Sequence, residues 1–394
     1  MRVRLNENYK NVKDSYLFSE IAARVRAYSA AHPEAKIIRL GIGDVTLPLP
    51  PVVVSAMQQA VSEMGSGSTF RGYPPEYGYD FLRSAISGYY AAQGVNVPAT
   101  DIFVSDGAKS DIGNIVELFA DNPVYIPDPV YPVYVDTNTM SGRDVHFLEG
   151  NDRNGFLPMP NGLQCEGAIF YLCSPNNPTG AVYSAAQLKE WVDFANATGS
   201  LILFDSAYEA FITGDAPHSI YAIPGAETCA VEICSFSKMA GFTGTRCAWT
   251  VVPQALAAAD GTLLQHMWMR RQATKFNGVS YPVQRAAEAA LSPEGLAQCR
   301  QNIRYYLDNA ALLSELLTRK GIPFTGGSQS PYVWLQCPGG MDSWAFFDHL
   351  LESVQIVGTP GAGFGEAGKN YFRLTAFGTR EATEEAVARL DRLL

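Results

Sequence analysis

The sequence contains no long hydrophobic run. Its longest uninterrupted apolar stretch is Ala168–Cys173, whereas a helix needs about 20 apolar residues to span a bilayer. The residues after Met1 are repeatedly charged and lack the apolar segment of a secretory signal. We therefore expect neither a membrane span nor export.

Positively charged residues are also fewer than negatively charged ones, and no cysteines or histidines have the spacing of metal ligands. Lys and Arg number 29 against 39 Asp and Glu, which gives a formal net charge of −10, so no general positive field exists to attract nucleic acid or an anionic membrane. The seven cysteines are odd in number and include no Cys-x-x-Cys pair, and the five histidines are scattered. We expect no disulfide framework and no metal site, but reduced, mostly buried thiols in a cytoplasmic protein.

What the chain does contain is alternation between short β-branched or aromatic runs and longer helical patterns. A helix is predicted over Ser184–Thr198. The predicted strands are Ile102–Ser105, Val124–Pro127, Ala168–Leu172, Leu201–Asp205, Ala230–Ser235 and Thr245–Val252. This pattern predicts an α/β fold with a mostly parallel sheet covered on both faces, and such sheets bind ligands at the carboxyl ends of their strands.

The pattern changes from about Leu291 onward, where helices dominate. The predicted elements are helices over Pro293–Lys320 and Asp342–Ser353, strands at Pro331–Cys337 and Tyr371–Phe377, and a closing helix capped by Thr379. We expect a large domain over residues 45–285 and a smaller α+β domain built from residues 1–44 and 286–394, with the first residues as an arm.

One glycine motif points to a different function. Gly363-Phe-Gly365-Glu-Ala-Gly368 matches the G-x-G-x-x-G pattern of dinucleotide folds, but it leads into a predicted strand instead of opening a helix, and no acidic ribose partner follows at the usual distance. A glycine turn is the favoured interpretation. The hypothesis of a nicotinamide-dependent dehydrogenase would depend on this loop alone.

The most informative segment runs from Ser235 to Arg246 and follows a predicted buried strand. Lys238 stands there among Ser235, Ser237 and several glycines. A lysine amine at the end of a strand can form an imine with a carbonyl cofactor, and Arg246 offers a planar fork for phosphate. By itself the segment is equally compatible with a solvated lysine in a flexible glycine loop.

Other predicted strands also end in polar residues. Asp205 ends an apolar strand and can pair with a protonated ring nitrogen or cap a helix. Ala108 and Lys109 open a helix whose N–H groups can bind phosphate, or form a simple turn. Tyr131 can stack on a planar ring or pack on the surface, and Asn177 can donate to a phenolate oxygen or form an Asx turn.

Together with Tyr208 and Arg373, these residues resemble fold-type I, pyridoxal-phosphate-dependent aminotransferases in their order and approximate spacing. The resemblance implies that Lys238 is the catalytic amine that holds the cofactor and transfers the proton. It implies that Asp205 pairs with the ring nitrogen, that Tyr208 and Asn177 bind the ring oxygen, and that Tyr131 stacks on the ring. It assigns the phosphate to Ala108, Lys109, Ser235, Ser237 and Arg246, and the substrate carboxylate to Arg373.

Within this group the chain resembles the LL-diaminopimelate aminotransferase family. The segments that carry this resemblance are Tyr16–Ile21, Arg39–Thr46, Gly72–Leu82, Ser105–Lys109, Thr274–Gly278 and Thr359–Gly365. The resemblance implies a homodimer in which Tyr73, Glu76 and Asn277 reach the neighbouring active site, Tyr73 contacting cofactor as well as substrate. It also implies that Tyr16, Gly43, Lys109, Tyr131 and Asn177 contact the substrate.

The implied reaction transfers an amino group from LL-2,6-diaminopimelate to 2-oxoglutarate. In the reverse direction, which belongs to lysine biosynthesis, glutamate aminates tetrahydrodipicolinate. Diaminopimelate has an amino-acid group at each end, so Glu76 suits its distal ammonium and Lys109 its distal carboxylate. Three alternatives remain: an aminotransferase for aromatic or dicarboxylic amino acids, a lyase on the same fold, and a binding module without catalysis.

Overall fold

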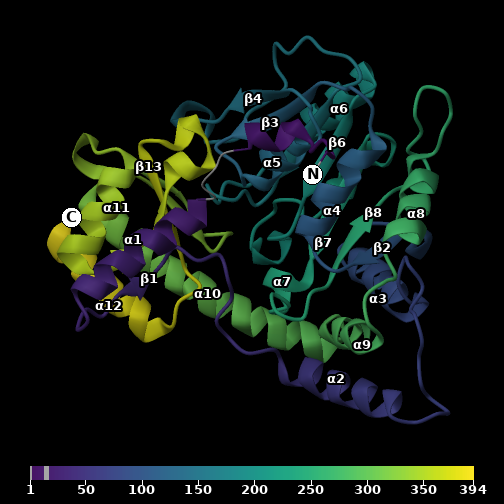
Figure 1. Ribbon diagram of the computed structural model, residues 1–394, viewed down its shortest axis with the longest axis horizontal. Coiled ribbons are helices and arrows are strands. Elements are labelled where there is room, and N and C mark those ends of the chain that lie inside the picture. Colours follow the sequence, from purple (N-terminus) through teal and green to yellow (C-terminus); the bar gives the residue numbers. More distant parts are fainter. Residues whose placement is uncertain (1, 13–16) are drawn as a thin grey trace.

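Seven strands form the main sheet of the computed structural model, which describes residues 2–12 and 17–394 (Figure 1). In spatial order they are β2 (Ile102–Ser105), β8 (Ala248–Val251), β7 (Ala230–Ser235), β6 (Leu201–Asp205), β5 (Ile169–Cys173), β3 (Val124–Asp128) and β4 (Val145–Glu149). Strand β8 is antiparallel to both of its neighbours, and the other neighbouring pairs are parallel. The predicted α/β fold with a mostly parallel sheet is confirmed.

Helices cover both faces of this sheet. All five residues of β5 are buried: Tyr171 packs toward one face and Phe170 toward the other, as the alternation of side chains along a strand requires. One face is covered by α4 (Ala108–Ile115), α5 (Val133–Met140) and α8 (Leu264–Lys275), and the other by α6 (Ala185–Thr198). A further cluster joins β2 and β8 to α2 (Pro51–Met64), α3 (Asp80–Ala91) and α9 (Tyr281–Ala290).

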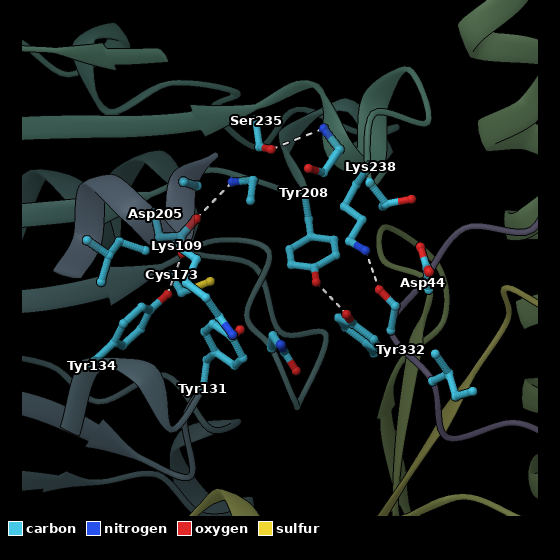
Figure 2. A pocket seen from close by; sticks show the side chains of 18 of the residues that line it. Asp44, Lys109, Tyr131, Tyr134, Cys173, Asp205, Tyr208, Ser235, Lys238 and Tyr332 are labelled. Carbon is cyan, nitrogen blue, oxygen red and sulfur yellow. Dashed lines mark hydrogen bonds between the residues drawn. The ribbon is translucent and has the colours of Figure 1, made fainter. Parts of the chain in front are cut away.

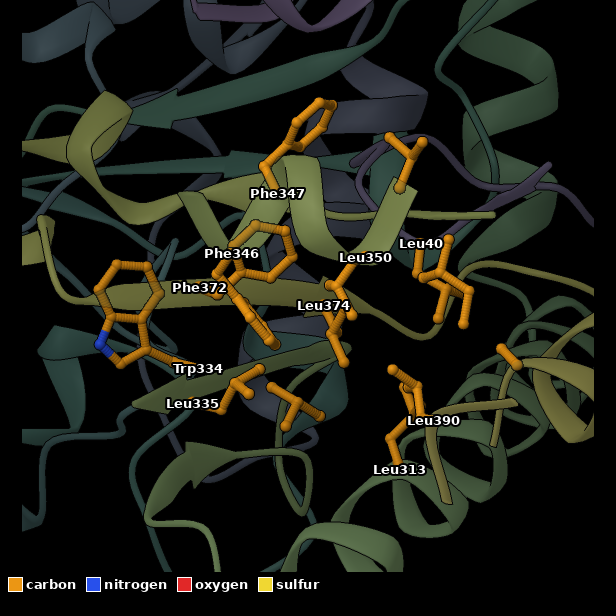
Figure 3. Close-up of a cluster of buried hydrophobic side chains, with 14 of the residues drawn as sticks. Leu40, Leu313, Trp334, Leu335, Phe346, Phe347, Leu350, Phe372, Leu374 and Leu390 are labelled. Atoms are coloured by element: carbon orange, nitrogen blue, oxygen red, sulfur yellow. The ribbon is translucent and has the colours of Figure 1, made fainter. Parts of the chain in front are cut away.

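A second, smaller sheet lies in the C-terminal part of the chain. Its antiparallel strands, in order, are β12 (Thr359–Pro360), β13 (Tyr371–Thr375), β10 (Tyr332–Gln336) and β9 (Phe324–Gly326). A short parallel pair joins β1 (Ile38–Arg39) to β11 (Ile356–Val357). The core on this sheet is built with α1 (Leu17–Ala31), α11 (Ser343–Val354) and α12 (Arg380–Leu393) (Figure 3). Thr379 caps α12 as predicted, since its side chain accepts from the Ala382 N–H.

The long helix α10 (Pro293–Lys320) connects the two regions (Figure 1). Cys299 near its start packs with the cluster around β2 and β8, whereas Leu313 and Leu317 near its end pack in the core of the smaller sheet. The N-terminal segment also contacts both regions: α1 belongs to the smaller core, and the Asn6 side chain donates to the Met140 carbonyl at 3.1 Å. The division into residues 45–285 and the remainder stays a prediction.

The Gly363–Gly368 loop does not open a helix. It forms two short 3₁₀ turns, η9 (Gly361–Phe364) and η10 (Glu366–Gly368), and then leads into β13. Gly365 has φ +139°, and a Cβ there would lie 1.8 Å from an Asp128 carboxylate oxygen. The glycine therefore permits a close approach between the two segments, and the prediction of a turn is confirmed.

Other general features follow from the described residues. The cysteines are free thiols, and all are buried except the half-buried Cys165. Within residues 2–12 and 17–394, no helix combines the length and the apolar character that crossing a membrane requires. The same residues contain no group of three or more His, Cys, Asp or Glu side chains arranged to hold a metal ion.

Candidate active site

A cavity of about 440 Å³ opens where the carboxyl ends of the parallel strands meet the smaller sheet (Figure 2). Strands β2, β3, β5, β6 and β7 all end at this edge, so the polar residues that follow them are brought together. The predicted site residues that line it are Gly43, Ala108, Lys109, Tyr131, Asn177, Asp205, Tyr208, Ser235, Ser237, Lys238, Arg246 and Arg373.

Lys238 lies in α7 (Phe236–Met239), a single turn that follows β7. Ser235 caps this turn by accepting from the Ser237 N–H at 3.0 Å, and the Lys238 amine donates to the Gly43 carbonyl. Burial lowers the pKa of Lys238 to about 8, with Arg373 and Arg246 acting in the same direction and Asp44 opposing them. A lysine with a lowered pKa is a better nucleophile near neutral pH.

Asp205 lies at the end of β6 and is almost completely buried. Its carboxylate accepts from the Tyr134 hydroxyl at 2.6 Å and from the Ala207 N–H at 3.0 Å. Burial raises the pKa of Asp205, and these two hydrogen bonds oppose that rise. An anion held in this way is suited to a cationic partner inside the cavity.

One corner of the cavity is a cradle for an anion. The helix α4 begins at Ala108, so its first N–H groups point toward this corner. Arg246 has a left-handed φ of +65° and donates to the Ser237 hydroxyl at 3.3 Å. A Cβ on Gly107 would lie 2.0 Å from a nitrogen of the Arg246 guanidinium, so a larger residue there would displace the guanidinium from this position.

Arg373 enters the cavity from the middle of β13 in the smaller sheet. Its guanidinium donates to the Asn177 side-chain oxygen at 2.6 Å and to the Gly41 carbonyl at 2.9 Å, and it lies 4.5 Å above the Tyr332 ring. The Tyr332 hydroxyl forms a short hydrogen bond with the Tyr208 hydroxyl. The two sheets are therefore joined across the cavity by polar side chains.

Lys109 and Tyr131 form another wall. The Lys109 amine lies 5.8 Å from the centre of the Tyr131 ring, and that ring meets Tyr134 edge to face. The face of Tyr131 thus takes part in a cation–π contact, and the same ring packs at a right angle to the Tyr134 ring.

Three predicted site residues do not line the cavity, and a fourth falls outside the part of the chain that the structure describes. Tyr16 lies outside the described residues. Tyr73 is 87% exposed, Asn277 is exposed and Glu76 is half-buried. The loops that carry these three meet, because a Cβ on Gly278 would lie 2.7 Å from the Pro75 carbonyl oxygen. Within a single chain these loops therefore meet outside the cavity.

Our sequence reasoning missed several lining residues, above all Asp44, Tyr134 and Tyr332. Asp44 directly follows Gly43, and Tyr134 lies one helical turn beyond Tyr131, so each had a predicted site residue nearby. Tyr332 falls within the predicted strand Pro331–Cys337, but no motif marked it.

Comparison with known proteins identifies the family. Residues 35–390 match the family described as aminotransferase class I and II. The chain belongs to this family. LL-diaminopimelate aminotransferase from Chlamydomonas reinhardtii is similar at 42% identity with a TM-score of 0.94, over 100% of this chain and 99% of that one. A substrate-bound BacF structure from Bacillus subtilis is similar at 28% identity with a TM-score of 0.85, over 100% and 98% of the two chains.

More distant members share the fold. A single mutant of Thermus thermophilus aspartate aminotransferase is 21% identical, with a TM-score of 0.86 and full coverage of both chains. Members of the class I and II family use pyridoxal 5′-phosphate, and this is the cofactor of the present chain.

The cavity fits this cofactor. The Arg246 guanidinium, which occupies the space that Gly107 leaves free, and the α4 N-terminus suit the phosphate. The buried Asp205 carboxylate suits a protonated ring nitrogen, and the Lys238 amine, with its lowered pKa, suits the aldehyde. A phosphate, a cationic ring and a carbonyl thus each have a partner of matching chemistry.

Proposed function

We propose that this protein transfers an amino group between LL-2,6-diaminopimelate and 2-oxoglutarate, a reaction of lysine biosynthesis. The observation that carries the proposal is the similarity to the LL-diaminopimelate aminotransferase of C. reinhardtii over the whole chain, at 42% identity. In the biosynthetic direction, glutamate would aminate tetrahydrodipicolinate.

The chemistry of the side chains gives each residue a role. When bound, pyridoxal phosphate withdraws electrons from the bonds at the substrate Cα. Arg373 binds the substrate α-carboxylate with its planar fork, close to Asn177. Lys238 would carry the proton between the substrate Cα and the C4′ position of the cofactor, a task suited to an amine with a pKa of about 8.

The cofactor is held by the remaining lining residues. Asp205 stays ionised next to the ring nitrogen, and Tyr208 and Asn177 bind the ring oxygen. Tyr131 stacks on the ring. Ala108, Lys109, Ser235, Ser237 and Arg246 bind the phosphate, and Gly43 and Lys109 contact the substrate together with Tyr131 and Asn177.

We further propose a cytoplasmic homodimer with shared active sites. Tyr73, Glu76 and Asn277 lie on two loops that meet outside the cavity of their own chain, and residues that serve a neighbouring copy would lie outside their own cavity in this way. Glu76 would then face the distal ammonium of diaminopimelate. Tyr16 is assigned to the substrate on the resemblance alone.

The function is tested with a panel of amino donors and 2-oxoglutarate as the acceptor. The panel contains LL- and meso-diaminopimelate, aspartate, lysine and phenylalanine. We expect LL-diaminopimelate to have the highest kcat/KM, and Lys238→Ala to lose both activity and the visible absorbance of the bound cofactor. A higher kcat/KM for aspartate or phenylalanine would replace the proposal with a broader aminotransferase, and keto-acid release without acceptor would indicate a lyase.

Shared active sites are tested by mixing variants. Lys238→Ala and Glu76→Ala homodimers are each expected to be poor with LL-diaminopimelate. A mixed dimer has one site with neither substitution, so co-expression should restore part of the activity. Failure to restore activity, with mixed dimers shown by mass spectrometry, would contradict the assignment of Glu76 to the neighbouring site.

A further inference from the structure

Tyr332 lines the cavity from the smaller sheet. It lies on β10 and is 1% exposed, and its hydroxyl is hydrogen-bonded to the Tyr208 hydroxyl across the cavity (Figure 2). The two rings meet edge to face, with their centres 5.1 Å apart. Within residues 2–12 and 17–394, the Tyr332 hydroxyl has no other hydrogen-bond partner. It is therefore joined to a residue that we assign to the cofactor.

The two hydroxyls share one hydrogen bond but carry two protons. Both side chains are buried, and burial raises the pKa of each hydroxyl, so both keep their protons near neutral pH. Only one of these protons can lie between the two oxygens. The other points elsewhere, so the choice of donor decides whether Tyr208 or Tyr332 has a proton left for a third group.

The Arg373 guanidinium favours donation from Tyr332. It lies 4.5 Å above the Tyr332 ring, and its positive charge opposes the rise that burial gives to the pKa of Tyr332. A cation beside a phenol makes its hydroxyl a stronger hydrogen-bond donor. When Tyr332 donates, the Tyr208 oxygen accepts, and the Tyr208 proton remains for an acceptor inside the cavity.

The other residue that we assign to the ring oxygen, Asn177, is also bonded to the smaller sheet. Its side-chain oxygen accepts from the Arg373 guanidinium at 2.6 Å, so its amide N–H groups remain as donors. Tyr332 pairs with Thr375, two residues along β13 from Arg373, so the Tyr332 and Arg373 side chains lie on the same face of that sheet. One face of the smaller sheet thus contacts both donors to the ring oxygen.

We propose that Tyr332 is a positioning residue that donates to Tyr208 and thereby aims the Tyr208 proton at the ring oxygen of pyridoxal phosphate. This inference rests on the proposed function, to which the assignment of Tyr208 to that oxygen belongs. A donor draws electron density from the ring oxygen, so the oxygen holds less tightly the proton that it shares with the Lys238 nitrogen. Tyr332 therefore lowers the pH at which the holoenzyme loses that proton.

The test is a pH titration of the visible absorbance of the holoenzyme, without any amino donor. Removal of one donor from a chain of hydrogen bonds weakens the next bond by about 10–30%. For Tyr332→Phe we therefore expect the midpoint of the titration to rise by about 0.3 pH unit. Tyr183→Phe is the matched control and should keep the wild-type midpoint, because the buried Tyr183 hydroxyl donates to the Pro158 carbonyl and the residue does not line the cavity.

A second variant separates an effect through Tyr208 from any other effect of Tyr332. Tyr208→Phe should raise the midpoint further than Tyr332→Phe does. Addition of Tyr332→Phe to Tyr208→Phe should then cause no further rise, because no hydroxyl is left for Tyr332 to aim. An unchanged midpoint for Tyr332→Phe would overturn the inference. An equal rise in the wild-type and Tyr208→Phe backgrounds would also overturn it, because Tyr332 would then act without Tyr208.

Failure of the proposed function gives different results. The titration needs only bound cofactor, so it does not depend on which amino acid the enzyme accepts. A holoenzyme that shows the expected rise for Tyr332→Phe, but does not transaminate LL-diaminopimelate, would refute the substrate and support the role of Tyr332. A wild-type midpoint for Tyr208→Phe would refute the assignment of Tyr208 to the ring oxygen, and the role of Tyr332 with it.

Discussion

Replacement of Tyr134 by Phe would remove one hydroxyl from the buried partner of Asp205. The Tyr134 hydroxyl lies 2.6 Å from an Asp205 oxygen, and both side chains are buried. Hydrogen bonds to a charged group contribute about 1.5–3 kcal/mol. Asp205 keeps its bond from the Ala207 N–H, so we take the lower value and expect kcat to fall about tenfold.

The same substitution should change the pH dependence. Burial raises the pKa of Asp205, and the hydrogen bond from Tyr134 opposes this rise. Without the hydroxyl the pKa rises further. The ring nitrogen needs an ionised carboxylate. As the solution is acidified, the variant therefore loses activity at a higher pH than the wild type, and the acid limb of its kcat/KM profile shifts to higher pH.

The assay is the pH profile of kcat/KM for wild type, Tyr134→Phe and Tyr183→Phe, together with the thermal midpoint of each. Tyr183 is a matched control because its buried hydroxyl donates to the Pro158 carbonyl at 2.9 Å and it does not line the cavity. A profile for Tyr134→Phe with the wild-type acid limb would refute the role of Tyr134, whatever the loss of stability.

Two further predictions concern helix α4 and the glycine that precedes it. Gly107→Ala should weaken pyridoxal phosphate binding at least tenfold, measured by fluorescence titration of the apoenzyme, because the new Cβ would lie 2.0 Å from the Arg246 guanidinium; unchanged affinity would show that Arg246 is not needed there. Asp111 has its pKa raised to about 7 by burial, so the folded state holds a proton that the unfolded state has already released, and stability falls as the pH rises through 7. Between pH 6 and 8 the free energy of unfolding should fall by about 1.4 kcal/mol because of this group. Urea titrations of Asp111→Asn should not show that fall. An equal change in the free energy of unfolding with pH for the two proteins would contradict the buried-proton explanation.

The sequence predicted the site best where a residue ends a buried strand or follows it within four positions. Asp205, Asn177 and Lys238 each come after an apolar run, and the parallel arrangement of those strands places their ends at one edge. Residues on other elements were missed. Tyr134 faces the cavity from a helix with no recognisable motif, and Tyr332 comes from the smaller sheet.

The strand prediction was least accurate around Thr245–Val252. The observed strand β8 begins only at Ala248, because Arg246 adopts a left-handed φ of +65° that a strand does not allow. Strand β4 was not predicted at all: it is an edge strand with mostly exposed residues, so it lacks the apolar run on which the other predictions depended.

The reversed direction of β8 explains why Arg246 reaches the cavity. In a parallel strand the residue before the strand lies at the amino edge of the sheet, opposite the ligand. Strand β8 is antiparallel to both β7 and β2, so its start lies at the edge where those strands end. The chain therefore leaves β7, forms the turn that holds Lys238, and enters β8 without leaving that edge. One loop thus supplies both the amine and the guanidinium, and the short connection keeps the two cations close enough for Arg246 to help lower the pKa of Lys238.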